Sequence, residues 1–217
     1  MAAVLGIIDM QRGFFPASEG TRLGLPGFGE LGVSDAPEIL PLVQALIDAA
    51  SRDGLPVFYT QDWHPRASAH FADAPNFVTN WPVHCVAETP GAALHPDLAF
   101  PPAALRVTKG MEVLTDGADD TSYSAWNGQT PGGVPLARVL KTLSADVVYL
   151  AGLASDYCVG HTALDIAQRG GYRVCVVEPA TRPVNPVTAG AMRERLVAAG
   201  VTFVSVEAAT AAWAGAR

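Results

Sequence analysis

The sequence predicts an α/β protein whose core is an open, doubly wound parallel sheet of about six strands with helices on both faces. We expect this sheet to form one domain over residues 1–217, a length that suits a domain of ordinary size. Apolar runs of strand length alternate along the chain with segments of helical periodicity, which is the pattern of a parallel α/β sheet. The chain is also 49% hydrophobic and only 16% charged, so it can cover both faces of such a sheet.

The expected strands are continuous apolar runs, which are typical of strands that are buried on both faces. The first run ends directly before Asp9, and the third leads into Lys109. The six expected strands cover residues 3–8, 55–60, 105–108, 146–152, 172–177 and 201–206.

Between these runs lie segments in which apolar residues recur at helical spacing. Ser34 or Asp35 could cap the first helix, and Ser155 or Asp156 could cap the helix that contains Cys158. The four expected helices cover residues 37–52, 135–144, a segment from this second cap to residue 167, and residues 186–199. Proline and glycine cluster in three expected loops, at residues 23–32, 89–102 and 129–135.

The amino-acid composition limits the kinds of binding partner and the cellular compartment that we expect. A formal net charge of −7 argues against nucleic acid or an anionic membrane as the main partner. No run of 18 uncharged apolar residues appears, and the N-terminus has no basic leader, so we expect a cytoplasmic protein. The three cysteines are too few for a disulfide scaffold, and we interpret Cys85 and Cys175 as structural thiols.

Chemically active side chains follow the expected strand ends. Ligands bind at the carboxyl ends of the strands in open α/β sheets, so we expect these side chains to meet at one edge. They are Asp9 after the first strand, Asp62 and His64 after the second, Lys109 after the third and Cys158 after the fourth.

Asp62-Trp63-His64 indicates a metal site. Residues i and i+2 of an extended segment point to the same side, so Asp62 and His64 can bind one ion together. A carboxylate with imidazoles, here including His84, suits Zn²⁺, Fe²⁺ or Mn²⁺. His95 is expected to be a structural imidazole, and the role of His70 stays open.

Cys158 is the candidate nucleophile because it lies near the start of a helix, where the dipole and free amides lower the pKa of a thiol. Lys109 would favour the thiolate, and Asp9 could accept the thiol proton. The backbone amides of the turn at Ala154 and Cys158 would hold an oxyanion. Each residue taken alone also has a structural interpretation: a small buried thiol, a solvated cation and a turn residue.

Six segments, in this order, resemble the nicotinamidases of the isochorismatase-like cysteine hydrolase superfamily. The resemblance covers about residues 1–206. The segments are Ile8-Asp9-Met10-Gln11, Gln61-Asp62-Trp63-His64-Pro65, Trp81-Pro82-Val83-His84-Cys85-Val86, Thr108-Lys109-Gly110, Ser122-Tyr123-Ser124-Ala125-Trp126 and Gly152-Leu153-Ala154-Ser155-Asp156-Tyr157-Cys158-Val159.

The resemblance implies a catalytic triad and a metal site. The triad would be Asp9, Lys109 and Cys158, with the oxyanion held by the amides of Ala154 and Cys158 after a cis peptide between Leu153 and Ala154. The metal ligands would be Asp62, His64 and His84, and Ser68 stands where a further contact can lie. One divalent ion is implied, with zinc as the first expectation and iron or manganese as alternatives.

The resemblance also implies a substrate pocket in which Phe14 and Trp81 sandwich a pyridine ring and Tyr123 and Tyr157 line the sides. Two segments depart from the family pattern: Arg12-Gly13 replaces an Asn-Asp pair, and Ser68 and His70 stand in exchanged order.

The implied reaction converts nicotinamide and water to nicotinate and ammonia in NAD salvage. The partner would be this small molecule, with no nucleic acid and no membrane, and a homo-oligomer is possible. Two alternatives stay open: a hydrolase of another heteroaromatic or aliphatic amide, and a metal-binding regulatory module without turnover.

Overall fold

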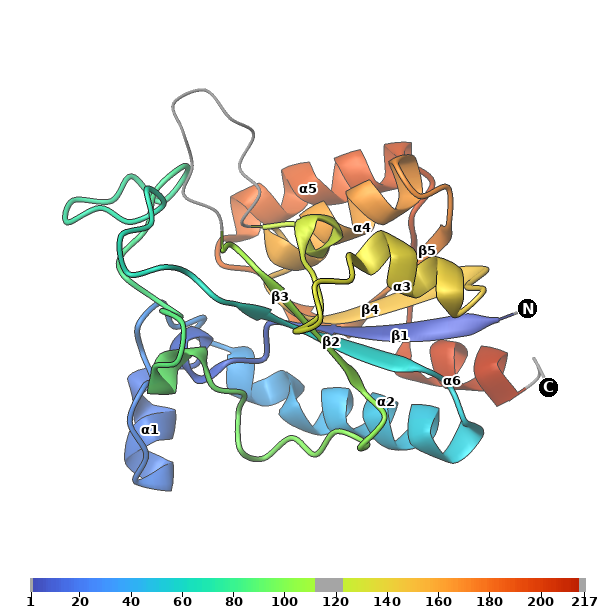
Figure 1. Ribbon diagram of the computed structural model, residues 1–217, viewed down its shortest axis with the longest axis horizontal. Helices are drawn as coiled ribbons and strands as arrows, with labels where there is room; N and C mark the ends of the chain where they lie inside the picture. Colours follow the sequence, from blue (N-terminus) through green and yellow to red (C-terminus); the bar gives the residue numbers. More distant parts are fainter. Residues whose placement is uncertain (1, 112–122, 215–217) are drawn as a thin grey trace.

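A computed structural model describes residues 2–111 and 123–214, and its core is a six-stranded sheet in the order β3-β2-β1-β4-β5-β6 (Figure 1). All five strand pairings are parallel, which confirms the predicted fold class. The strands are β1 (Ala3–Ile8), β2 (Val57–Asp62), β3 (Leu105–Lys109), β4 (Val147–Leu153), β5 (Arg173–Arg182) and β6 (Thr202–Val204).

Helices cover both faces of the sheet: α2 and α6 lie on one face, and α3, α4 and α5 on the other (Figure 1). Leu5 and Ile7 of β1 belong to the first apolar cluster, whereas Val4 and Ile8 belong to the second, as the alternation of a strand requires. The helices are α1 (Ala17–Leu23), α2 (Leu40–Asp53), α3 (Leu136–Thr142), α4 (Cys158–Gln168), α5 (Pro186–Ala198) and α6 (Val206–Ala214).

Short 3₁₀ turns connect the strands and helices, and two of them lie next to the site. The turn Arg12–Phe14 follows β1, and the turn Ala125–Asn127 precedes α3. Two more turns, at Ala36–Ile39 and Pro90–Ala92, lead into α2 and into the loop before β3.

Several predicted boundaries were wrong. The second strand ends at Asp62 rather than Thr60, because its pairing with β3 continues to the register pair Asp62 and Lys109. The last strand is shorter than predicted because Val206 begins α6, a helix that the sequence analysis did not expect. Helix α1 was not expected either.

The two predicted helix caps fared differently. Asp35 is the N-cap of the 3₁₀ turn Ala36–Ile39 that leads into α2, but its side chain makes no cap bond, and the N-cap of α2 itself is Ile39. The prediction of Ser155 or Asp156 as the cap of α4 was wrong: the N-cap is Tyr157, without a side-chain cap bond, and the carboxylate of Asp156 accepts the amides of Val184 and Asn185 instead.

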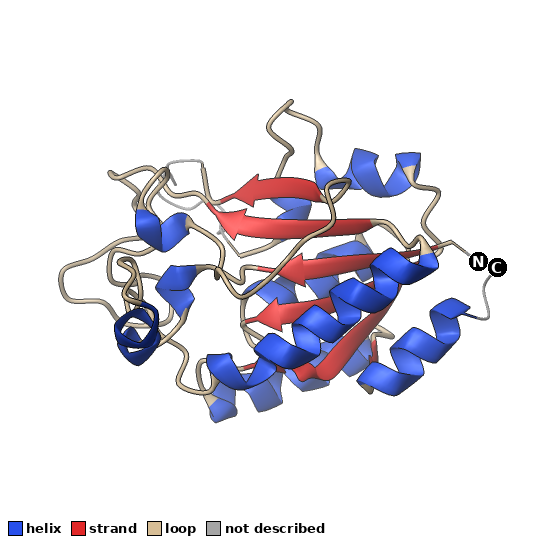
Figure 2. Cartoon of the chain, turned by 90° about the horizontal axis from the view of Figure 1, so that it is seen from below, coloured by secondary structure: helices blue, strands red, loops and turns tan. Residues whose placement is uncertain are grey.

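The strand arrows point toward one end of the molecule, where the longer loops and α1 gather (Figure 2). Asp9, Asp62, Lys109 and Cys158 all stand at this end, so the predicted meeting of strand ends is confirmed. Across residues 2–111 and 123–214, no helix combines the length and apolar character that a membrane crossing requires.

Candidate active site

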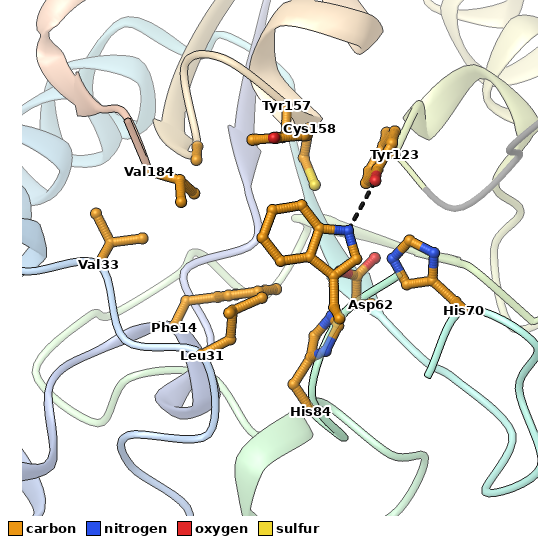
Figure 3. Close-up of a pocket in the computed structure, with 12 residues that line it drawn as sticks. Phe14, Leu31, Val33, Asp62, His70, His84, Tyr123, Tyr157, Cys158 and Val184 are labelled. Carbon is orange, nitrogen blue, oxygen red and sulfur yellow. Dashed lines mark hydrogen bonds between the residues drawn. The ribbon is translucent and has the colours of Figure 1, made fainter. Parts of the chain in front are cut away.

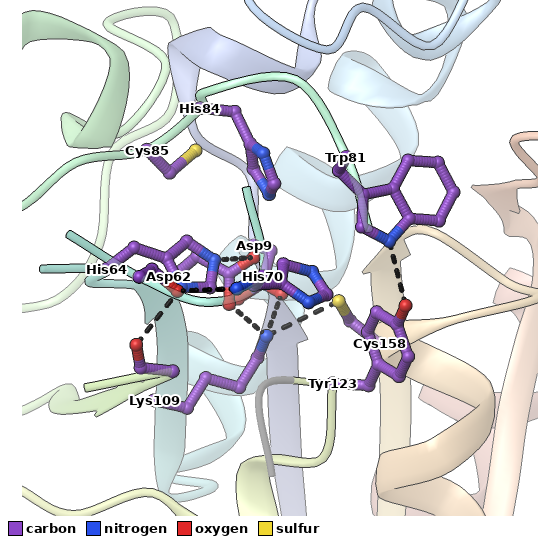
Figure 4. A network of polar contacts seen from close by, with 12 residues as sticks. Asp9, Asp62, His64, His70, Trp81, His84, Cys85, Lys109, Tyr123 and Cys158 are labelled. Atoms are coloured by element: carbon purple, nitrogen blue, oxygen red, sulfur yellow. Dashed lines mark hydrogen bonds and ion pairs between the residues drawn. The ribbon is translucent and has the colours of Figure 1, made fainter. Parts of the chain in front are cut away.

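The ammonium group of Lys109 is the centre of a buried polar cluster (Figure 4). Its Nζ lies 2.8 Å from Oδ2 of Asp9 and 3.3 Å from Sγ of Cys158, and it also contacts Oδ1 of Asp62. The structure therefore brings the three predicted catalytic residues together, and it adds Asp62 to the same ammonium group. Because Asp62 and Lys109 are register partners in β2 and β3, sheet pairing itself sets this contact.

Thr60 fixes the carboxylate of Asp9, and the sequence analysis missed it. The Thr60 hydroxyl donates to Oδ1 of Asp9 over 2.5 Å, and the Asp9 amide donates to the same hydroxyl oxygen over 3.1 Å. Asp9 has a φ of 47°, in the left-handed region that residues other than glycine rarely adopt. Thr60 lies two residues before Asp62 on the same strand, and this i, i+2 spacing is the signal that could have identified it.

The charges of the cluster depend on one another. Burial opposes ionisation of Asp62, but the adjacent Lys109 holds the pKa of this carboxyl well below its usual range. Burial also opposes the charge of Lys109, yet Asp62 and Asp9 together hold its pKa well above the usual lysine range. Burial raises the pKa of Asp9, with Lys109 acting in the opposite direction. The two carboxylates therefore favour the charged form of Lys109, and burial favours the protonated form of Asp9, whereas the pKa of Asp62 is lowered.

Lys109 lowers the pKa of the Cys158 thiol, as expected from the sequence, but burial outweighs this effect. Burial raises the pKa of Cys158 well above the usual thiol range, and the carboxylates of Asp9 and Asp62 add to the effect of burial. Lys109 opposes this shift without reversing it. Burial therefore disfavours the thiolate, Lys109 favours it, and the Asp9 carboxylate lies close enough to this centre to take up the thiol proton.

The turn between β4 and α4 presents backbone amides beside Cys158. The peptide between Leu153 and Ala154 is cis, as the family resemblance implied. Gly152 has a φ of 112°, and a Cβ atom there would lie 2.1 Å from the carbonyl oxygen of Ile8, so only glycine fits. In the described part of the chain, the amides of Ala154 and Cys158 have no backbone acceptor, which leaves both available to a ligand.

Three histidines form a buried cluster next to this charged group. One ring nitrogen each from His64, His70 and His84 can be chosen so that all three atoms lie within 4.8 Å of one another. The sequence analysis predicted His64 and His84, but it left His70 open, because a loop histidine six residues after His64 has no short-range signal. Oδ2 of Asp62, the third predicted ligand, lies 3.6 Å from Nε2 of His64.

The histidine cluster fits a divalent metal ion. Nδ1 of His64 lies 3.0 Å from the carbonyl oxygen of Gly110, and Nδ1 of His84 lies 2.7 Å from that of Pro82. These carbonyls accept from Nδ1 and leave Nε2 of both rings to bind a ligand, and Nε2 of His64 has no hydrogen-bond partner among the described residues. Burial and the neighbouring His64 lower the pKa of His84 to about 3, so this ring is neutral, as a metal ligand must be.

Side-chain hydrogen bonds hold these candidate ligands in place. The Ser68 hydroxyl oxygen accepts a hydrogen bond of 3.2 Å from the backbone N–H of His70. The buried amide of Gln11 accepts from the Asp62 N–H over 2.7 Å and donates to the Asp62 carbonyl over 2.8 Å, as a neighbouring strand would. Gln11 thereby extends the sheet pairing past the end of β1 and orients Asp62.

A pocket lined largely by apolar and aromatic side chains opens above the sulfur of Cys158 (Figure 3). The four residues that were predicted to bind substrate, Phe14, Trp81, Tyr123 and Tyr157, all line it. An aliphatic wall of Leu31, Val33 and Val184, which the sequence did not predict, comes from segments far apart in the chain. The full lining is Phe14, Leu31, Val33, Asp62, His70, Trp81, His84, Tyr123, Ala154, Tyr157, Cys158 and Val184.

The aromatic rings of the pocket contact one another. Nε1 of Trp81 donates to the hydroxyl of Tyr123 over 2.8 Å, and its ring meets that of Tyr157 edge-on at 4.9 Å between centroids. The ring of Phe14 lies 5.6 Å from that of His84, so the pocket extends to the histidine cluster. A flat aromatic ligand here would lie between the thiol and the candidate metal ligands.

His95 and Cys175 lie outside this centre, whereas Cys85 lies directly after His84 and the ring of His161 is 5.3 Å from that of Tyr123. His95 is buried against Phe15 and Phe28, which agrees with the structural role predicted for it. Cys85 is fully buried, whereas Cys175 is half-buried in β5 with its sulfur 3.1 Å from the Thr202 hydroxyl.

The isochorismatase domain family matches residues 2–208, and the chain belongs to this family. The nicotinamidase/pyrazinamidase of Mycobacterium tuberculosis (strain ATCC 25618 / H37Rv) is 33% identical over 196 residues, covering 89% of each chain. Among solved structures, the pyrazinamidase of Pyrococcus horikoshii in complex with zinc is 28% identical, with a TM-score of 0.76 over 94% of this chain and 99% of that one. PnC1 from L. infantum in complex with nicotinate is 31% identical, with a TM-score of 0.74 over 95% and 94% of the two chains.

Proposed function

We propose that this chain is a nicotinamidase, which hydrolyses nicotinamide to nicotinate and ammonia through a thioester on Cys158. The observation that carries the proposal is the placement of the Cys158 thiol, the Asp9 carboxylate and the Lys109 ammonium group at the floor of an aromatic pocket beside three histidines. The relatives that are nicotinamidases or pyrazinamidases support the same substrate class. Nicotinate produced in this way would enter NAD salvage.

In the first step, Asp9 accepts the thiol proton while the sulfur of Cys158 forms a bond to the carboxamide carbon. The π electrons of the carbonyl move onto oxygen, and the amides of Ala154 and Cys158 donate to this oxyanion. The raised pKa of Asp9 suits a group that must hold a proton in one step and release it in the next.

In the second step, the oxyanion collapses and the carbon–nitrogen bond breaks, while Asp9 gives its proton to the departing ammonia. Water then attacks the thioester, Asp9 accepts a proton from that water, and the sulfur leaves and recovers the proton as a thiol. Lys109 keeps its charge throughout, and it holds Asp9 within reach of the sulfur.

Asp62, His64, His70 and His84 would hold one divalent metal ion. Nε2 of His64 is the clearest candidate ligand atom, because it is buried and has no hydrogen-bond partner among the described residues. Such an ion supplies Lewis acidity toward a ring nitrogen or a water molecule. Imidazole and carboxylate donors suit zinc, iron and manganese, and Ser68 remains a candidate for a further contact.

Ammonia release from a panel of amides tests this proposal. Nicotinamide and benzamide have the same shape, but only nicotinamide has a ring nitrogen, so we expect benzamide to react at least about a hundredfold more slowly, as expected for a site built to bind a polar atom. Removal of metal with a chelator should abolish this difference. Similar rates for the two amides, or turnover of an aliphatic amide alone, would contradict the proposal.

A further inference from the structure

Asp156 lies inside the turn that carries the nucleophile, yet it does not cap the helix that follows. The residue is 3% exposed, and it stands between Ala154 and Cys158, two residues that line the pocket. The N-cap of α4 is Tyr157, and no side chain makes a cap bond there. The buried carboxylate of Asp156 therefore does not stabilise the start of α4.

The carboxylate is bound by the start of α5 instead. Oδ1 accepts the Val184 amide over 2.9 Å, and Oδ2 accepts the Asn185 amide over 3.0 Å and the Thr188 hydroxyl over 2.6 Å. A charged acceptor strengthens such bonds, and a carboxylate is stabilised at the N-terminus of a helix. Asp156 therefore attaches the catalytic turn to the connection between β5 and α5.

The next residue back is attached to the same connection. The amide of Ser155 donates to the carbonyl oxygen of Arg182, at the end of β5, over 2.9 Å. Two successive residues of the turn are thus held from outside, so neither peptide plane can rotate freely. Ala154 and Cys158 lie on either side of these two anchored residues in the chain.

We propose that Asp156 is a positioning residue for the oxyanion site: it holds the turn so that the amides of Ala154 and Cys158 converge on one carbonyl oxygen. The proposal rests on the thioester mechanism above, since only a tetrahedral oxygen needs both amides at once. Asp156 itself is not among the residues that line the pocket, and its carboxylate is bound by Val184, Asn185 and Thr188.

A pair of ligands separates this role from a general structural one. Pyridine-3-carbaldehyde adds to the thiol: sulfur bonds to the carbonyl carbon, the π electrons move onto oxygen, and the thiol proton passes to Asp9. The resulting thiohemiacetal places a tetrahedral oxygen at the two amides. Nicotinate fills the same pocket without a bond to sulfur, so its affinity reports the pocket alone.

The central variant is Asp156→Asn, which keeps the shape but sets an NH₂ group against donors. We expect kcat for nicotinamide and affinity for the aldehyde to fall by about a hundredfold, in the range found when one oxyanion donor is lost. KM and nicotinate affinity should stay within about threefold. The matched control is Asp165→Asn, which removes a carboxylate of α4 that pairs with Arg169 at 3.5 Å, and it should behave as the wild type.

A milder variant at Thr188 keeps the test valid if Asp156→Asn fails to fold. Thr188 is exposed, and its hydroxyl supplies only one of the three hydrogen bonds to the Asp156 carboxylate. Thr188→Val should lower aldehyde affinity by about three- to tenfold, the value of one hydrogen bond, and Thr188→Ser should restore it. Equal losses for aldehyde and nicotinate, or wild-type aldehyde affinity in Asp156→Asn, would overturn the positioning role alone. A wild-type protein that neither hydrolyses nicotinamide nor binds the aldehyde would overturn the proposed function and this proposal with it.

Discussion

The charged floor of the pocket and its aromatic walls are built in different ways. Asp9, Asp62 and Lys109 stand at the ends of adjacent parallel strands, so backbone pairing sets their separation. Trp81 and Tyr123 stand in segments outside the sheet, and their rings are held by contacts with other side chains. The floor is therefore fixed by the fold, whereas the walls can change without disturbing it.

This difference has a physical basis. A parallel ladder fixes each strand end through several hydrogen bonds, and a shift of one residue would turn every side chain to the other face. Loops tolerate substitution because few backbone bonds depend on them. We therefore expect substitutions in the floor to change the rate by orders of magnitude, and substitutions in the walls to change binding and selectivity.

The largest effect should come from the sulfur of the floor. Cys158→Ala removes the nucleophile, and we expect turnover of nicotinamide to fall by about 10⁴-fold or more. Cys175→Ala is the matched control, because this second thiol lies in β5, away from the pocket. Ammonia release measures both, and comparable losses in the two variants would show that Cys158 is not the nucleophile.

The charged residues of the floor should act as one unit. Asp9→Asn removes the proton acceptor, and we expect a loss of about 10³-fold or more in kcat. Lys109→Met should cost a similar amount alone but add little in the double variant, because Lys109 acts on the sulfur together with Asp9. Steady-state rates of the two single variants and the double variant measure this coupling, and additive losses would contradict a shared role.

His70 lies in a loop, but its ring belongs to the histidine cluster beside the charged floor of the pocket. Its removal therefore tests whether a loop residue contributes to the floor. We expect His70→Ala to weaken metal binding by more than about tenfold, since even the partners of metal ligands have effects of this size. His161→Ala is the control, because this histidine lies outside the three-histidine cluster. Metal content after dialysis against a graded chelator is the measurement, and unchanged retention in His70→Ala would remove it from the ligand set.

Two single hydroxyls allow a direct comparison of floor and wall. Thr60→Val removes the donor to Asp9, and we expect about a tenfold or greater loss in kcat, since hydrogen bonds to charged groups contribute about 1.5–3 kcal/mol. Tyr123→Phe removes the acceptor of the Trp81 indole, and we expect only a few-fold rise in KM. Thr60→Ser should restore the rate. A larger loss of kcat in Tyr123→Phe than in Thr60→Val would reverse the comparison.

The local pattern of the sequence was enough to predict the alternation of strands and helices, the residues at each strand end and the cysteine at the start of a helix. Those features depend on neighbours within a few positions: Asp62 and His64 share a side because they are two residues apart, and Cys158 follows an apolar run directly. The boundaries were less accurate, because pairing with β3 decides where β2 ends and the start of α6 shortens the last strand.

Tertiary structure alone decided how the site is completed and charged. His70 reaches His64 and His84 through the path of a loop, and Asp156 reaches α5 rather than the helix beside it, because both contacts join segments with no shared period. The pKa of Cys158 is raised rather than lowered, since it depends on burial and on carboxylates that are distant in the chain. A sequence pattern records which groups are present at the strand ends, but burial and long-range distance determine what those groups do to one another.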